Sequence, residues 1–483
     1  MTDTHEEHHT DNVQEHLKQV ESLLHKHVLL KEVIHRQELP REDRHELVET
    51  LVHKQHLAEL RRKLDSLHPA DIAYILEALP IEERLLVWDL VKSERDGEIL
   101  IEVSDAVRDS LIATMNREEL SAAAGQLDTD EIADLAPDLP QNVMRDVFKS
   151  LSIEEREQLR AAISYEKDSV GALMDFNMIP IRSDISLEVV SRYLRRFDEL
   201  PDHTDQLFVV DRDDRFTGVL PLNRIVVNEP EVIVSQVMVT DTIQLHPDEK
   251  AEQAAQAFER YDLVSAPVVD EDGKLVGRVT VNVVLDFIRT EAENDLLNQA
   301  GLREEEDIFA SVWKSAQNRW TWLALNLCTA FFASRVIGSF EGTIEKFVAL
   351  ATLMPIVAGI AGNSANQTTT IIIRSLALGQ ITHDNARRLL LKELAISGLN
   401  GLVWGGVAGL FAYLLYHSVS LGVVMTSAMV LNLLVGATVG LAIPLIMQKL
   451  GRDPAIGSSV MITAITDSAG FFIFLGLATI FLI

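Results

Sequence analysis

The stretch Thr463–Gly476, TAITDSAGFFIFLG, places Asp467 inside an apolar run that extends from about Ala455 to the C-terminal Ile483. About 20 residues of helix cross the hydrocarbon core of a bilayer, so the run predicts a membrane span. An ionised carboxylate at that depth costs at least about 3 kcal/mol. Asp467 therefore needs an ion pair, a proton or a passing cation to offset this cost.

Four further apolar stretches precede this run: Trp320–Phe340, Val348–Ile373, Leu394–Tyr416 and Leu421–Met447. Each reaches the length of a span, and the joints between them are short and polar. Alternate joints carry the basic residues, which mark the cytoplasmic side. The sequence thus predicts five spans, with the N-terminal part in the cytoplasm and the C-terminus outside. The basic joints contain Lys314 and Arg319, then Arg374, Arg387, Arg388 and Lys392, then Lys449 and Arg452.

The chain of 483 residues has two parts of very different charge. Residues 313–483 contain ten Lys/Arg and six Asp/Glu, whereas the first 312 residues contain 33 basic and 67 acidic side chains. An acidic surface of this kind argues against a nucleic-acid partner, because nucleic-acid binding needs clustered Lys and Arg.

The single cysteine, Cys328, excludes an internal disulfide framework. The polar N-terminus predicts no cleavable signal peptide. The sequence shows no nucleophile–base set and no P-loop, so we do not expect an enzyme.

Several modules are expected before the spans. Residues 1–60 are a charged extension rich in His, including His5, His8, His9, His25 and His27, which we interpret as solvated and partly helical rather than as a metal site. Residues 61–172 repeat one phrase at a spacing of 60 residues, Asp71–Pro80 and Glu131–Pro140, which predicts a stack of helical repeats.

Residues 173–234 and 235–290 each contain a β-branched run, an acidic turn and a second strand, FVVDRDDRFTGVLPL and PVVDEDGKLVGRVTV. This tandem resembles a pair of CBS domains, which are α+β modules. The nucleotide-binding form of that family has Thr or Ser followed three residues later by Asp. Here Pro221 with Arg224, and Thr280 with Val283, stand at these positions, so nucleotide binding through the usual contact is not expected.

The second span is interrupted by a polar segment, GNSANQTTT, at residues 362–370, which we expect to break an otherwise apolar helix. Polar groups at membrane depth are tolerated against protein or a water-filled path. One interpretation is a pore lining, in which Gly359, Asn363, Asn366 and Gln367 face a hydrated ion. The other is a face of small residues for helix packing. Three carboxamides within five residues favour the pore.

The order of these modules resembles the MgtE family of magnesium channels and transporters. The motifs that carry the resemblance are HPADIA at His68–Ala73, P-x-x-x-G-x-x-G-N-x-x-x-Q at Pro355–Gln367, and DPAIGS through TDSAGFF at Asp453–Phe472. The resemblance implies a homodimer in the plasma (bacterial inner) membrane with one central pore. It also implies that Asp467 and Thr463 line this pore and meet hydrated Mg²⁺, which is held by few carboxylates because it gives up water reluctantly.

Two other roles for Asp467 stay open. It could pair with Arg335 in the first span, or it could belong to a proton relay, although no second acid is expected within a span. The corresponding alternative function is a secondary transporter of Mg²⁺, Co²⁺, Ni²⁺ or Zn²⁺ coupled to H⁺ or Na⁺.

The resemblance also implies an acidic plug helix over residues 291–318. It further implies that acidic side chains bind regulatory Mg²⁺ ions, and that the binding of these ions closes the pore. Lys250, Val283 and Asn294 stand where further acids would be, so we expect weakened inhibition by Mg²⁺. The acids at expected regulatory positions are Glu252, Asp262, Asp286, Glu291 and Asp295.

Overall fold

The computed structural model describes residues 13–26, 57–302, 307–377, 380–381, 383–452, 454 and 457–483. The chain forms two compact units, Met1–Glu291 with Glu306–Ala310, and Ala292–Glu305 with Ser311–Ile483. We call them the N-terminal unit and the membrane unit. His5, His8, His9 and His27 lie outside the described residues.

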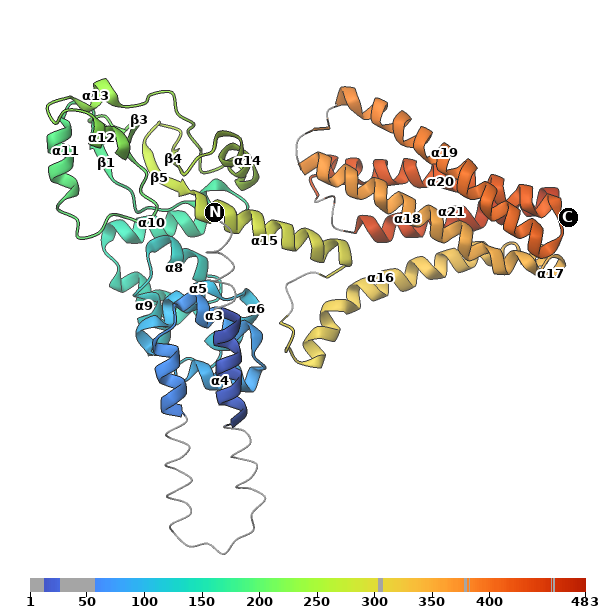
Figure 1. Ribbon diagram of the computed structural model, residues 1–483, viewed down its shortest axis with the longest axis horizontal. Helices are drawn as coiled ribbons and strands as arrows, with labels where there is room; N and C mark the ends of the chain where they lie inside the picture. Colours follow the sequence, from blue (N-terminus) through green and yellow to red (C-terminus); the bar gives the residue numbers. More distant parts are fainter. Residues whose placement is uncertain are drawn as a thin grey trace, which may run out of the picture. The chain divides into compact units, whose positions relative to one another are not determined.

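The first part of the N-terminal unit is a stack of short helices (Figure 1). Their apolar faces form one continuous core that reaches from Val20 to Leu159. The proline of each repeated Leu-Pro step is the N-cap of the helix that follows, which begins at Ile81 or Gln141, because a proline cannot continue the hydrogen bonding of a preceding turn. After helical residues 13–26 and 57–65 the order is α3 (Pro69–Ala78), α4 (Ile81–Trp88), η1 (Ser93–Arg95), α5 (Asp96–Glu102), α6 (Asp105–Ile112), α7 (Arg117–Ala124), α8 (Thr129–Leu135), α9 (Gln141–Ser150) and α10 (Ile153–Ser164).

Two small sheets follow in the same unit. In the first, β2 pairs parallel with β1 and antiparallel with β3, and in the second β4 pairs antiparallel with β5. The acidic turns predicted between the strands close both hairpins: Asp211 accepts from the backbone N–H of Asp213, and Gly273 has a φ of 77°. The elements are η2 (Val170–Leu173), β1 (Pro180–Arg182), α11 (Leu187–Leu194), β2 (Gln206–Val210), β3 (Phe216–Pro221), α12 (Leu222–Val227), α13 (Val234–Val237), α14 (Ala251–Tyr261), β4 (Ser265–Val269) and β5 (Leu275–Thr280).

A 20-residue helix, α15 (Val281–Ala300), follows β5 directly. Its sequence carries the acids Asp286, Glu291, Glu293 and Asp295. It runs without interruption through the expected domain boundary at residue 290.

The membrane unit consists of long helices joined by short connections (Figure 1). Many large apolar side chains on them are exposed to the surroundings, such as Trp404 at 58% and Phe411 at 61%. Such exposure is expected for surfaces that face lipid rather than water. The helices are α16 (Val312–Gly338), α17 (Glu341–Lys346), α18 (Ala349–Ala377), α19 (His383–Tyr416), α20 (Val419–Lys449) and α21 (Ser458–Phe481).

Among the described residues, four helices are long and apolar enough to cross a membrane: α16, α19, α20 and α21. The predicted second span corresponds to α18, which does not reach the same hydropathy because its segment 362–370 is polar. The prediction that this segment interrupts the helix is wrong, since α18 is helical from Ala349 to Ala377. Its carboxamides are side-chain features on an intact helix, because a helix satisfies its own backbone groups.

Candidate functional site

Asp467 lies near the middle of α21 and is half-buried. The structure gives its carboxylate no hydrogen bond or ion pair with any of the residues it describes. The alternative partner Arg335 is exposed in the last turn of α16 and forms no ion pair with Asp467. The pairing that would make Asp467 a structural charge is therefore not made.

Helix α18 runs antiparallel to α21 beside this carboxylate. A Cβ built on Gly362 would lie 3.5 Å from Thr466 Oγ1, and one built on Gly470 would lie 3.5 Å from the Cα of Ala358. The two contacts advance in opposite directions along the two helices, so Asp467 lies at the level of Ala361. The small residues of α18 thus let the backbone of α21 approach closely, as the packing interpretation expects.

Thr463 lies one turn before Asp467 and is exposed, and its hydroxyl donates to the carbonyl of Ser459 at 2.9 Å. A spacing of four residues puts the two side chains on one face of α21. The sequence-predicted pair thus shares a helix face. A hydroxyl and a carboxylate arranged in this way offer oxygen atoms to a hydrated cation.

Asn363 and Gln367 lie together in a different place. They line a cavity of about 300 Å³ between α18, α19 and α20, together with Asn400 and Trp404. Asp467 does not line this cavity. Within one chain, the structure therefore separates the predicted carboxamide pair from the predicted pore acid.

The remaining predicted residues of α18 face other surroundings. Gly359 is exposed, and nothing would lie within 4 Å of a Cβ added there. Asn366 is half-buried, and its backbone carbonyl accepts from Thr370 Oγ1 at 3.0 Å.

A second buried acid occurs in the membrane unit, one residue before the predicted third span. Glu393 on α19 is 6% exposed, and its carboxylate accepts from Thr368 Oγ1 of α18 at 3.0 Å. The sequence places Glu393 next to Lys392 in one of the basic joints, and it was not among the residues singled out from the sequence. Its burial depends on where α18 packs, which the local sequence does not reveal.

The five predicted regulatory acids fall in separate places. Glu252 lies in the first turn of α14, and Asp262 caps its other end in the left-handed conformation, with φ 50°. They are ten positions apart along this helix, which separates them by roughly 15 Å. Glu291 and Asp295 are four residues apart on α15 and share a face, whereas Asp286 points elsewhere on that helix. Among the described residues no group of three or more His, Cys, Asp or Glu could hold a metal ion.

An acidic cluster that the sequence did not single out lies around α8. Burial, followed by the charge of Asp175, raises the pKa of Asp130 from 3.8 to about 7. Burial also raises the pKa of Asp134 to about 6. Both side chains line a cavity of about 770 Å³ within the N-terminal unit. The signal was present in the run DTDEIAD, but its significance depends on Asp175, which is distant in sequence.

The side chains at the positions that would contact a nucleotide are hydrogen-bonded elsewhere, buried or apolar. The guanidinium of Arg224 donates to the carbonyl of Val237, and Thr280 is only 3% exposed. Val283 carries no polar group. Neither Arg224 nor Val283 provides a carboxylate at the position where a ribose would be held.

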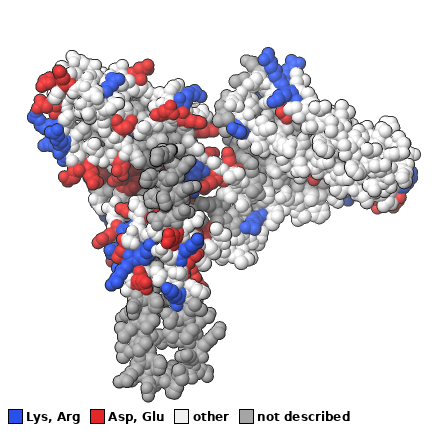
Figure 2. Space-filling view, viewed as in Figure 1, with Lys and Arg blue, Asp and Glu red and all other residues white. Residues whose placement is uncertain are grey.

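Charge is distributed very differently over the two units. On the visible face of the N-terminal unit Asp and Glu are numerous, whereas the visible face of the long helices of the membrane unit is nearly free of charge (Figure 2). The second pattern is the one required of helices surrounded by hydrocarbon.

Three family models match the chain. They are described as a divalent cation transporter over residues 354–477, the MgtE intracellular N domain over residues 67–168, and a CBS domain over residues 234–290.

Two relatives and one solved structure illustrate the similarity. A "Magnesium transporter MgtE" of Thermus thermophilus is 30% identical over 433 residues, which cover 88% of this chain and 95% of the relative. One of Bacillus subtilis is 27% identical over 426 residues, covering 88% and 94% respectively. The solved "cytosolic domain of the Mg2+ channel MgtE in complex with ATP" is 29% identical, covers 50% of this chain and 98% of that chain, and gives a TM-score of 0.45. On the identity and coverage of these relatives, the chain belongs to the MgtE family of magnesium transporters.

Proposed function

We propose that this protein is a Mg²⁺-selective channel in which Asp467 and Thr463 face the ion path. The observation that supports this most strongly is the half-buried Asp467 carboxylate, which has no counter-ion among the described residues. A hydrated Mg²⁺ is a suitable partner, because this ion keeps much of its water and is held by one or two carboxylates.

The proposed assembly is a homodimer with one pore. Two copies of Asp467 related by the two-fold axis would form a ring of negative charge, which favours cations. Asn363, Asn366, Gln367 and Gly359 are proposed as pore-wall positions. Because Asn363 and Gln367 line a cavity between α18, α19 and α20 within one chain, we assign them to the wall behind the acid rather than to the same ring.

The proposed gate is the acidic cytosolic part. Without cations its carboxylates repel one another, and divalent ions screen and bridge them. Glu252, Asp262, Asp286, Glu291 and Asp295 are the proposed regulatory ligands, and the C-terminus is proposed to lie outside the cell. Nucleotide regulation through the usual ribose contact is not part of the proposal, because neither expected position carries an acid.

Mg²⁺ uptake by liposomes carrying the full chain tests the pore assignment. We expect Asp467→Asn and Asp467→Ala to reduce uptake at least about tenfold, since removal of the ring charge weakens cation attraction. Glu341→Gln, at an exposed acid of α17, is the matched control and should transport normally. Normal uptake by Asp467→Ala would refute the assignment.

Glu393 favours a second candidate function, a proton-coupled transporter. This buried acid with a hydroxyl partner, Thr368, is the kind of group that could carry a proton within the membrane. Currents through the two candidates differ. A channel reverses at the Nernst potential of Mg²⁺ at every pH, whereas coupling shifts the reversal potential with the pH gradient. We expect no shift, and a shift that Glu393→Gln abolishes would favour the transporter.

A further inference from the structure

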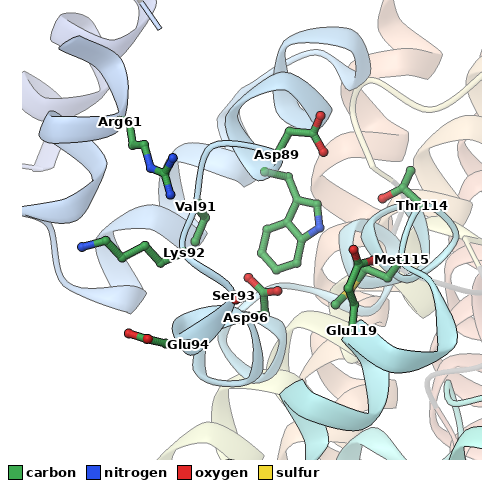
Figure 3. A pocket seen from close by; sticks show the side chains of 11 residues that line it. Arg61, Asp89, Val91, Lys92, Ser93, Glu94, Asp96, Thr114, Met115 and Glu119 are labelled. Carbon is green, nitrogen blue, oxygen red and sulfur yellow. The ribbon is translucent and has the colours of Figure 1, made fainter. Parts of the chain in front are cut away.

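A cavity of about 570 Å³ opens between helix ends in the helical part of the N-terminal unit (Figure 3). It is formed where α4 ends, α5 begins and α6 connects to α7. A cavity of this size can accept a small organic molecule. Its lining includes Trp88, Asp96, Thr114, Met115 and Glu119.

Asp96 is the polar group that distinguishes this cavity. It is only 8% exposed, and its carboxylate points into the open space (Figure 3). The structure gives it no hydrogen bond or ion pair with the residues it describes. Buried carboxylates are normally paired, because an ionised group loses its hydration on burial. An unpaired one that faces a cavity is available as a hydrogen-bond acceptor for a ligand.

The walls define the chemistry of this ligand. Trp88 is 7% exposed and lines the cavity beside Asp96, so an indole surface is available there. Cations are attracted to the face of an indole ring. Glu119 adds a second carboxylate, although one of its oxygens already accepts from the backbone N–H of Asn116 at 2.8 Å.

Neither basic side chain of the lining neutralises Asp96 in the structure. Lys92 is exposed and pairs instead with Asp65 at 3.2 Å. Arg61 is exposed and forms no ion pair with Asp96.

A bare metal ion fits the cavity less well than an organic cation. Mg²⁺ and similar ions are held by several oxygen ligands. In the described part of the chain, no group of three or more acids, His or Cys could hold a metal. An alkyl chain with a positive end would use the indole, the carboxylate and the available volume together.

We propose that this cavity binds a small organic cation with a primary ammonium or guanidinium group, with Asp96 accepting its hydrogen bonds and Trp88 contacting its charge and its alkyl chain. The site is separate from the ion path and does not depend on the transport function. It gives the N-terminal unit a means of responding to a cation other than Mg²⁺.

Calorimetric titration of the full chain in lipid nanodiscs, at pH 7.5 and without Mg²⁺, tests the proposal. The probes are n-butylammonium and n-butylguanidinium, and n-butanol is the uncharged probe of matched shape. We expect saturable binding of at least one cation, at least tenfold tighter than that of butanol. Asp96→Asn should weaken it at least tenfold, whereas Glu154→Gln, an exposed acid on α10, should change it less than twofold.

Indole fluorescence provides a second readout that does not depend on the stability of the Asp96 variant. The cation probe should change the emission of the wild-type chain, and Trp88→Phe should abolish the change. The proposal is overturned if no cation probe binds, if butanol binds equally well, or if Asp96→Asn binds the cation as the wild type does. Transport is not measured in either assay, so these outcomes leave the proposed channel function unaffected.

Discussion

At the scale of single residues, the side chain of Arg84 is a charged group that is fully buried in the N-terminal unit. Its guanidinium donates to both carboxylate oxygens of Asp307, at 2.6 and 3.0 Å, and to the carbonyls of Leu76 and Leu79. Asp307 lies five residues before Val312, where α16 begins. Arg84→Met removes the ion pair of a buried carboxylate together with four donated hydrogen bonds, and we expect it to lower the free energy of unfolding by about 3–5 kcal/mol.

A double-mutant cycle with Asp307→Leu, measured by thermal unfolding of the full chain, checks this expectation. The double variant should lose less than the sum of the single variants, because both single variants break the same ion pair and the sum counts its loss twice. Arg192→Met is the control, since its ion pair with Glu188 is exposed on both sides and should contribute less than about 1 kcal/mol. Additive losses at Arg84 and Asp307 would contradict the predicted coupling.

Asp130 is the residue at which pH dependence should be seen. Burial raises its pKa from 3.8 in the unfolded chain to about 7, so the folded state binds more protons than the unfolded state between these values. The contribution of Asp130 to stability is therefore present at low pH and lost as pH rises through about 7. Asp130→Asn should stabilise the chain relative to the wild type by about 1–2 kcal/mol at pH 8 and have little effect at pH 4.

Asp146 provides the control of opposite sign. Arg117 and then Lys149 lower the pKa of its carboxyl group, so its stabilisation is present at neutral pH and lost in acid. Asp146→Asn should therefore lower the melting temperature at pH 8 and change it less at low pH. Thermal unfolding of the full chain at both pH values, without divalent cations, compares the two variants. Equal effects of Asp130→Asn at pH 4 and pH 8 would contradict the assigned pKa.

At the scale of elements, the contact between α18 and α20 depends on small residues. A Cβ added to Gly440 would lie 2.6 Å from the carbonyl oxygen of Ala365, and Gly436 makes a similar approach to Ala361. Because a backbone carbonyl cannot move aside as a side chain does, Gly440→Val should force the helices apart. We expect it to cost about 1–3 kcal/mol, measured as a lower melting temperature in detergent. Gly476→Ala on α21, where nothing lies within 4 Å, should leave the melting temperature unchanged or slightly higher.

The elements were predicted better from sequence than the sites they form. Length and hydropathy predict the long helices, since apolar composition over about 20 residues is a local property. The acidic turns and β-branched runs likewise predict both hairpins. The backbone of α18 was predicted wrongly because polar side chains do not themselves break a helix. The sequence could not reveal the burial of Glu393 or the pairing of Arg84 with Asp307, which are 223 positions apart, because both depend on tertiary packing.

At the scale of the whole molecule, the proposed gate depends on the charge of the cytosolic part. The first 312 residues carry 67 acidic and 33 basic side chains, yet Val283 and Asn294 on α15 replace acids expected for Mg²⁺ binding. Their spacing of eleven residues places them three turns apart on one helix face. The double variant Val283→Asp and Asn294→Asp should therefore strengthen cation binding and lower the Mg²⁺ concentration for half-inhibition about tenfold or more.

Conductance of the full chain in planar bilayers, measured while cytosolic Mg²⁺ is raised from zero until the current no longer falls, reports this inhibition. Lys149→Glu is the control, because it changes the net charge by the same two units at an exposed position of α9. If the general acidity of the cytosolic part sets the response, the control and the α15 variant will shift inhibition equally. If the positions of the acids on α15 set the response, only the double variant will shift the inhibition. We expect the second result, because Mg²⁺ requires oxygen ligands at fixed positions, which a diffuse negative field does not supply.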